Sequence, residues 1–132
     1  MEKERTFYVD IQRSRQPLTA IEKIKFKDLG DCLKLDELTK ESSIIFVPAN
    51  DIIVNVHNEK AEDKDYKNYI IIDAEGNKYL TGSNSFWNAY SDIMDELTDA
   101  DVDPVAEGIH IKVYRLPSKN YKGKEFITCS LN

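Results

Sequence analysis

Residues 68–97 constrain the fold of this chain more than any other stretch, because their pattern marks a strand, a tight turn, a second strand and a helix. Residues 69–73 are apolar and β-rich, and residues 74–77 supply turn residues that tolerate positive φ. Residues 78–81 form the return strand, which Gly82 ends. The helix that follows is capped by Ser83 or Ser85 and carries one apolar face, made of Phe86, Ala89, Tyr90, Ile93 and Leu97. A hairpin that feeds a helix leaves one sheet face to bury, so flanking segments must complete the core.

Three further segments alternate between apolar and polar residues, which predicts half-buried strands. They are residues 52–57, 109–115 and 125–131. Residues 21–26 also alternate and are interpreted as a strand, although Leu18, Ile21 and Leu29 would suit a helix.

From residue 52 onward the predicted order is three strands, a helix and two strands. This is the connectivity of the OB-fold, a five-stranded barrel that binds oligonucleotides through its second and third strands and two loops. We therefore expect a mainly β chain with an OB-like five-stranded barrel and one helix between the third and fourth strands. A two-layer α+β sandwich accepts the same order and stays open as an alternative.

The length of 132 residues predicts one domain spanning 1–132. In this interpretation residues 51–132 form the OB-like core and residues 1–50 are an N-terminal extension packed on it. The start of the chain lacks the apolar core of a signal peptide, so we expect a cytoplasmic protein without a membrane partner. Cys32 and Cys129 lie far apart in the sequence, and in that compartment reduced thiols are expected.

The net charge of −6 is distributed unevenly along the chain. Residues 1–27 carry +3, residues 28–108 carry −13, and residues 109–132 carry +4. The acidic total argues against a protein coated in basic charge, but a local basic surface can still bind a polyanion.

The strongest candidate site is the final hairpin, residues 109–131. Its strands and loop combine lysines for phosphates with aromatic rings on which bases can stack, which is how proteins bind single strands without reading their sequence. The predicted nucleic-acid-binding residues are Lys112, Tyr114, Lys119, Tyr121, Lys122, Lys124 and Phe126. An ordinary solvated hairpin, whose lysines protect a sheet edge from aggregation, is the competing interpretation. Tyr69 and Tyr79 lie on the expected second and third strands, where bases would stack, but core packing is favoured for Tyr69.

The chain lacks the motifs of the common enzymes and metal sites. A nucleophile elbow, a phosphate loop and a dinucleotide fingerprint are absent from the sequence. The two histidines lie on separate predicted strands, and Asp99, Asp101 and Asp103 lack the glycine and the glutamate of a calcium loop. We expect no catalytic residues, no metal and no cofactor.

Residues 79–86, Tyr-Leu-Thr-Gly-Ser-Asn-Ser-Phe, and residues 117–129, Pro-Ser-Lys-Asn-Tyr-Lys-Gly-Lys-Glu-Phe-Ile-Thr-Cys, carry a family resemblance. Together they resemble small single-stranded-DNA-binding OB-fold proteins of phages and conjugative plasmids in Gram-positive bacteria. The resemblance covers about the last eighty residues and implies coating of single-stranded DNA during replication or transfer, with replication or transfer proteins as further partners. The resemblance does not decide whether the chain prefers DNA or RNA, or whether it forms a homo-oligomer. The chain ends at a predicted strand instead of the flexible acidic tail with which many bacterial single-strand binders recruit partners.

The rival hypothesis is an acidic phage or plasmid protein that inhibits a host DNA-binding defence protein by mimicking DNA. The −13 charge of residues 28–108 motivates it, since a carboxylate-rich face can occupy a basic cleft. A structural or assembly subunit is a third alternative.

Overall fold

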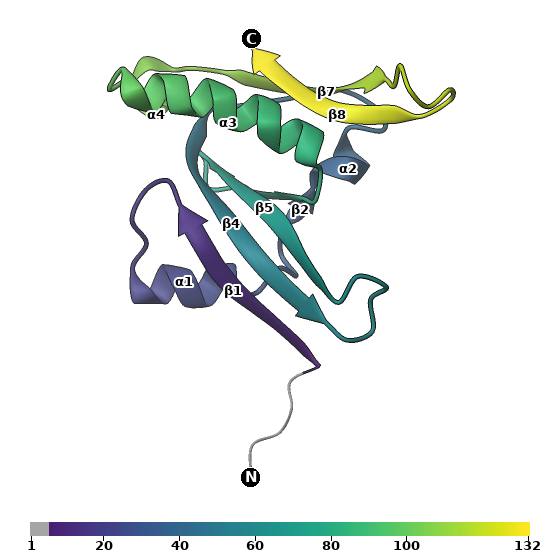
Figure 1. Cartoon of the computed structure of the whole chain (residues 1–132). Helices are drawn as coiled ribbons and strands as arrows, with labels where there is room; N and C mark the ends of the chain where they lie inside the picture. Colours follow the sequence, from purple (N-terminus) through teal and green to yellow (C-terminus); the bar gives the residue numbers. More distant parts are fainter. Residues whose placement is uncertain (1–5) are drawn as a thin grey trace.

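The computed structural model describes residues 6–132, which form eight strands and four helices (Figure 1). In chain order these are β1 (Phe7–Ser14), α1 (Ala20–Phe26), β2 (Leu33–Lys34), α2 (Leu35–Leu38), β3 (Ile44–Phe46), β4 (Pro48–Asn58), β5 (Asp65–Asp73), β6 (Lys78–Thr81), α3 (Asn84–Asp99), α4 (Pro104–Glu107), β7 (Ile111–Pro117) and β8 (Glu125–Leu131). The prediction of a mainly β chain is confirmed.

The strands form two sheets. Sheet A has the order β1-β4-β5-β6-β2, and sheet B has the order β3-β7-β8. Val47 alone separates β3 from β4, so the chain passes directly from sheet B into sheet A. This continuous stretch pairs with β7 at one end and with β5 along the rest of its length.

The expected closed barrel is wrong, because the strands remain in two separate sheets. The edge of β6 pairs in parallel with β2, where Leu33 lies opposite Tyr79. Beyond β2, the Thr81 hydroxyl donates to the Asp36 carboxylate at 2.7 Å, and Arg115 of β7 donates to the Asp36 carbonyl. Residues 33–39 are thus bonded to both β6 and β7, with Leu35 fully buried, and this segment takes the place of a direct ladder.

The sequence-based prediction of one helix is also corrected, since the described chain has four. The main helix, α3, lies where it was expected, and the Ser83 hydroxyl accepts the Phe86 N–H at 3.2 Å to cap it. Residues 21–26, however, were interpreted as a strand and belong to α1. A capping box between Thr19 and Glu22 starts this helix, because each side chain bonds the backbone N–H of the other residue.

The space between the two sheets is filled by α3 (Figure 1). Its residues Phe86, Tyr90 and Met94 are buried together with apolar side chains of both sheets. From the strands these are Phe46, Ile71, Tyr79, Ile111, Val113, Ile127 and Cys129.

The opposite face of sheet A has a separate apolar core. Phe26 of α1 is buried there, and Leu18 and Leu29 pack beside it. The sheet contributes Val9, Ile52, Val54, Val56 and Ile70. Sheet A therefore has an apolar core on each face. The first fifty residues contribute strands to both sheets, since β1 and β2 belong to sheet A and β3 belongs to sheet B.

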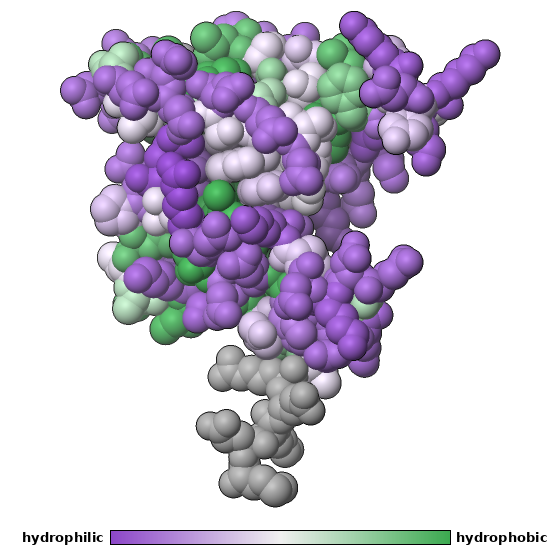
Figure 2. Space-filling view, in the orientation of Figure 1, coloured by the Kyte–Doolittle hydropathy of each residue, from purple (hydrophilic) through white to green (hydrophobic). Residues whose placement is uncertain are grey.

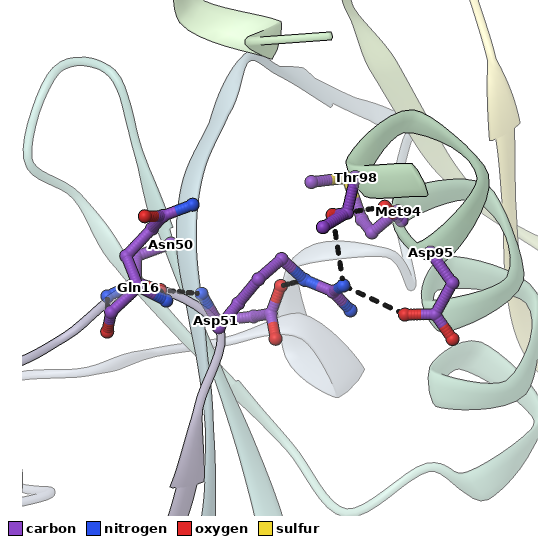
Figure 3. A network of polar contacts seen from close by, with 7 residues as sticks. Gln16, Asn50, Asp51, Met94, Asp95 and Thr98 are labelled. Atoms are coloured by element: carbon purple, nitrogen blue, oxygen red, sulfur yellow. Dashed lines mark hydrogen bonds and ion pairs between the residues drawn. The ribbon is translucent and has the colours of Figure 1, made fainter. Parts of the chain in front are cut away.

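A polar network joins α3 to the end of β1 (Figure 3). The Arg15 guanidinium donates to Asp51 at 2.6 Å, to Asp95 of α3 at 2.8 Å and to the Thr98 hydroxyl at 3.3 Å. The side chains of Arg15 and Asp51 are only 7% and 5% exposed. Burial raises the pKa of Asp51, and the Arg15 charge acts in the opposite direction.

Membrane-spanning helices are not found in residues 6–132, because none of the helices there is both long and apolar enough.

We expect Arg15→Ala to lower the free energy of unfolding by about 3 kcal/mol, because it leaves the buried Asp51 carboxylate without its counter-charge. The loss should shrink at acidic pH. Burial already raises the Asp51 pKa, and removal of the cation raises it further, so the carboxyl group takes up a proton as pH falls.

Urea unfolding at several pH values measures this, with Arg13→Ala as the matched control. Arg13 lies on β1, two residues before Arg15, and is exposed. It acts on Asp51 only through its charge and without a hydrogen bond, so its removal should cost no more than about 0.5 kcal/mol. Equal effects of the two substitutions would contradict the role assigned to Arg15.

Candidate nucleic-acid interface

Sheet B has one buried face and one outward face. Ile111, Val113, Ile127 and Cys129 alternate along β7 and β8 and are buried against α3. The residues between them point the other way, because successive side chains of a strand lie on opposite faces. Burial raises the pKa of the Cys129 thiol to about 12, so this buried side chain is uncharged at neutral pH.

The outward face of sheet B carries two of the predicted rings. Tyr114 lies opposite Thr128, and Leu116 lies opposite Phe126, so the two rings are diagonal neighbours across the strand pair. Tyr114 is half-buried, and Phe126 is 37% exposed. On β3, Ile45 lies opposite Lys112 on the same face and is 48% exposed. The result is an apolar and aromatic sheet surface, which we call the outer face of sheet B.

The loop between β7 and β8 holds a definite shape. Ser118 donates its N–H to the Lys124 carbonyl at 2.8 Å, and its hydroxyl accepts the Tyr121 N–H at 3.3 Å. Gly123 has a φ of 81°, in the left-handed region that favours glycine. A groove of about 700 Å³ lies along this loop and the strand ends, and its lining is Leu116, Pro117, Ser118, Lys119, Asn120, Tyr121, Lys124, Glu125 and Phe126.

Cations surround this surface. Lys119 and Lys124 line the groove, and Lys122 is exposed at the tip of the loop. At the other end of β7, the Lys112 ammonium lies 5.9 Å from the centre of the Tyr114 ring. Glu125 is the single acidic residue of the hairpin and also lines the groove. Arg115 points elsewhere, since it bonds Thr39 and the Asp36 carbonyl.

All seven predicted site residues thus lie on one hairpin. Lys112, Tyr114 and Phe126 lie on the outer face of sheet B, and the remaining four lie in the adjoining loop. Sequence reasoning missed Ile45 and Leu116, which extend the same face. The alternation of β7 could have indicated Leu116, but Ile45 comes from a distant strand whose pairing has no local signal.

Tyr69 of β5 and Tyr79 of β6, the two rings considered in the sequence analysis, are unavailable to a ligand. Tyr69 is buried and stacks on Trp87 with 4.6 Å between ring centres, which confirms its interpretation as a core residue. Tyr79 is also buried and stacks on Phe46 at 4.9 Å. Burial next to Asp73 raises the pKa of Tyr79 to about 12. On the other face of these strands, Ile70 is buried in the apolar core that contains Phe26 of α1.

Within residues 6–132, His, Cys, Asp and Glu side chains do not gather in any group of three or more suited to a metal ion. Asp103 instead caps α4, accepting the N–H groups of Val105 and Ala106.

Comparison with protein-family models, curated proteins and solved structures yields no match to this chain.

The loop between β4 and β5 is held by His57. Its two ring nitrogens lie 2.6 Å from the carboxylates of Asp65 and Glu59, and the ring stacks on Tyr8 at 4.8 Å. Hydrogen bonds to Asp65 and then Glu59 raise the pKa of His57 above its ordinary value of 6.5. This cluster lies on sheet A, apart from the hairpin site.

We expect an NMR titration of His57 to have its midpoint above 6.5. Because the folded state binds this proton more tightly than the unfolded chain, the stabilisation is complete below pH 6.5 and is lost as pH rises through the folded-state pKa. His57→Gln should remove that pH dependence from urea unfolding. A midpoint at or below 6.5 would contradict the ion-pair geometry.

Proposed function

We propose that this chain binds single-stranded nucleic acid, DNA in the first place, without reading its sequence. The observation that carries the proposal is the outer face of sheet B, where Tyr114 and Phe126 lie beside a lysine-rich loop. Bases would stack on these rings and on Tyr121, and Lys112, Lys119, Lys122 and Lys124 would bind phosphates.

The chemistry of this surface suits an unpaired strand better than a duplex. Base stacking on an aromatic side chain contributes about 1–3 kcal/mol per base and requires a base whose face is open. In a duplex each face is already stacked on its neighbours, so the rings would gain nothing. The groove beside Tyr121 and Phe126, with lysines on its walls, offers room for a flipped-out base.

The topology supports a relationship with the OB-fold. Residues 44–58, then β5, β6, α3, β7 and β8 follow the order of an OB-fold, and the first of these stretches is shared between both sheets as the first OB strand is. We infer an OB-like barrel that residues 33–39 have opened between the third and fifth strands. In this proposal the binding surface has moved from the covered second and third strands to the closing hairpin.

Together with the sequence resemblance, this supports our proposal of a role in the replication or transfer of a phage or conjugative plasmid, as a non-enzymatic coat for single-stranded DNA. Replication or transfer proteins would be its protein partners.

A second function follows from α3. Asp92, Asp95, Glu96 and Asp99 are all exposed on this helix, and such a carboxylate row could occupy the basic cleft of a host DNA-binding protein. This DNA-mimic hypothesis uses α3 instead of the hairpin. Loss of oligo-dT binding on substitution in the hairpin would therefore favour nucleic-acid binding over DNA mimicry.

We expect the double substitution Tyr114→Ala with Phe126→Ala to weaken binding of an oligo-dT at least tenfold, since it removes two stacking rings worth about 1–3 kcal/mol each. Fluorescence anisotropy measures the affinity, and urea unfolding verifies the fold. The matched control is Phe7→Ala with Ile24→Ala, which removes two apolar side chains that are 53% and 70% exposed elsewhere. Unchanged affinity in the hairpin double variant would remove the proposed site.

Neutralising Lys119, Lys122 and Lys124 to Gln should flatten the dependence of affinity on salt. Each phosphate contact contributes about −0.7 to the slope of log K against log salt for a single strand, so we expect the slope to become about 2 less negative. The charge-matched control replaces Lys25, Lys34 and Lys60, which are exposed on other elements. If both triple variants change the slope equally, the cations of the loop have no special part in binding.

A further inference from the structure

The edge of β1 offers backbone hydrogen bonds to an additional strand. β1 is the last strand of sheet A on its side, and within residues 6–132 it pairs with β4 alone. The Thr6 carbonyl accepts the Glu59 N–H, which shows that the backbone of Thr6 faces β4. In an antiparallel ladder every second residue faces the partner strand, so the N–H and C=O groups of Phe7, Val9 and Ile11 point away from β4. These are the donors and acceptors that strand addition uses.

A groove continues this edge toward α1. It has a volume of about 460 Å³ and is lined by residues 10–14 on one side and by Lys23 and Lys27 on the other. Lys23 lies in the middle of α1 and Lys27 is its C-cap, and because they are four residues apart they project on the same side. Ion pairs of either lysine are not found in the described part of the chain. Asp10 is the one carboxylate in the lining, and it lies on the opposite wall.

The helix that forms this wall also exposes apolar side chains. Ile21 and Ile24 are 66% and 70% exposed, while α1 uses Phe26 to cover the sheet. Ile24 lies three residues before Lys27, so the two side chains are neighbours on the helix surface and Ile24 borders the basic wall. Figure 2 shows apolar surface at the lower left, over α1, among hydrophilic side chains.

The edge is short, which limits what can pair with it. The register shifts between Ile11 and Arg13, and such a bulge ends regular pairing. A partner strand can therefore follow residues 7–11, and beyond the bulge its chain would enter the groove between β1 and the lysines.

We propose that the edge of β1 and the basic wall of α1 bind an extended peptide rich in Asp and Glu by strand addition. The ladder groups require a peptide backbone, which a nucleic acid does not have. The lysines select acidic side chains, and Ile24 provides contact for an apolar residue placed between them. This surface lies on sheet A and is independent of the hairpin site.

The probe is a synthetic eight-residue peptide in which Asp or Glu alternates with Val, blocked at both ends. We expect saturable binding by calorimetry and slower hydrogen exchange at the amides of Val9 and Ile11 in the complex. Lys23→Glu with Lys27→Glu should weaken the binding at least tenfold by charge repulsion. Lys25→Glu with Lys60→Glu, which changes the charge equally away from the groove, should leave the affinity within about twofold.

A second peptide keeps every charge but carries N-methyl groups at alternate residues, so it cannot form the ladder. Equal binding of the methylated and unmethylated peptides, or equal binding to the two charge-reversed proteins, would overturn the proposal. So would the lack of binding at about 1 mM peptide. Protection of Val9 and Ile11 by oligo-dT, and not by the peptide, would assign the groove to nucleic acid and also overturn it.

Discussion

The covering of sheet faces by helices determines which sheet face this protein leaves exposed. Burial of apolar surface contributes about 25 cal/mol per Å², so a sheet face with enough apolar residues is covered by another layer. Sheet A has such a layer on both faces, α3 on one and α1 on the other. Sheet B has α3 on one face, and its other face keeps Tyr114 and Phe126 at the surface.

Helix α3 contacts both the buried Arg15–Asp51 pair and the inner side of sheet B. Arg15 holds the last turns of the helix against Asp51 of sheet A, and at the first turn the Ser85 hydroxyl donates to the Ile127 carbonyl of β8 at 2.8 Å. The helix is therefore fixed to both sheets by polar contacts as well as by its apolar stripe. Buried ion pairs are costly to desolvate, and removing one partner leaves an uncompensated buried charge, so this contact ties the position of α3 to the presence of both Arg15 and Asp51.

Local patterns predicted the parts of the fold that depend on local chemistry. The hairpin of β5 and β6, the Ser83 cap of α3 and the two-sided pattern of β7 and β8 all follow from residues close together in the sequence. The helical state of α1 was missed, although the Thr19 and Glu22 capping box was visible. The separation of the strands into two sheets could not be predicted, because it depends on Asp36 bonding Thr81 and Arg115, which are 45 and 79 residues away. Arg15 resembled an ordinary surface cation for the same reason.

The location of the binding surface is tested most directly by an NMR titration of the protein with oligo-dT that follows every backbone amide. We expect the largest shifts on residues 112–128 of β7, β8 and their loop, and on Ile45 beside them, while α1 and the β5–β6 strands stay unchanged. Shifts concentrated on sheet A or on α3, with the hairpin unaffected, would show that the outer face of sheet B is not the binding surface.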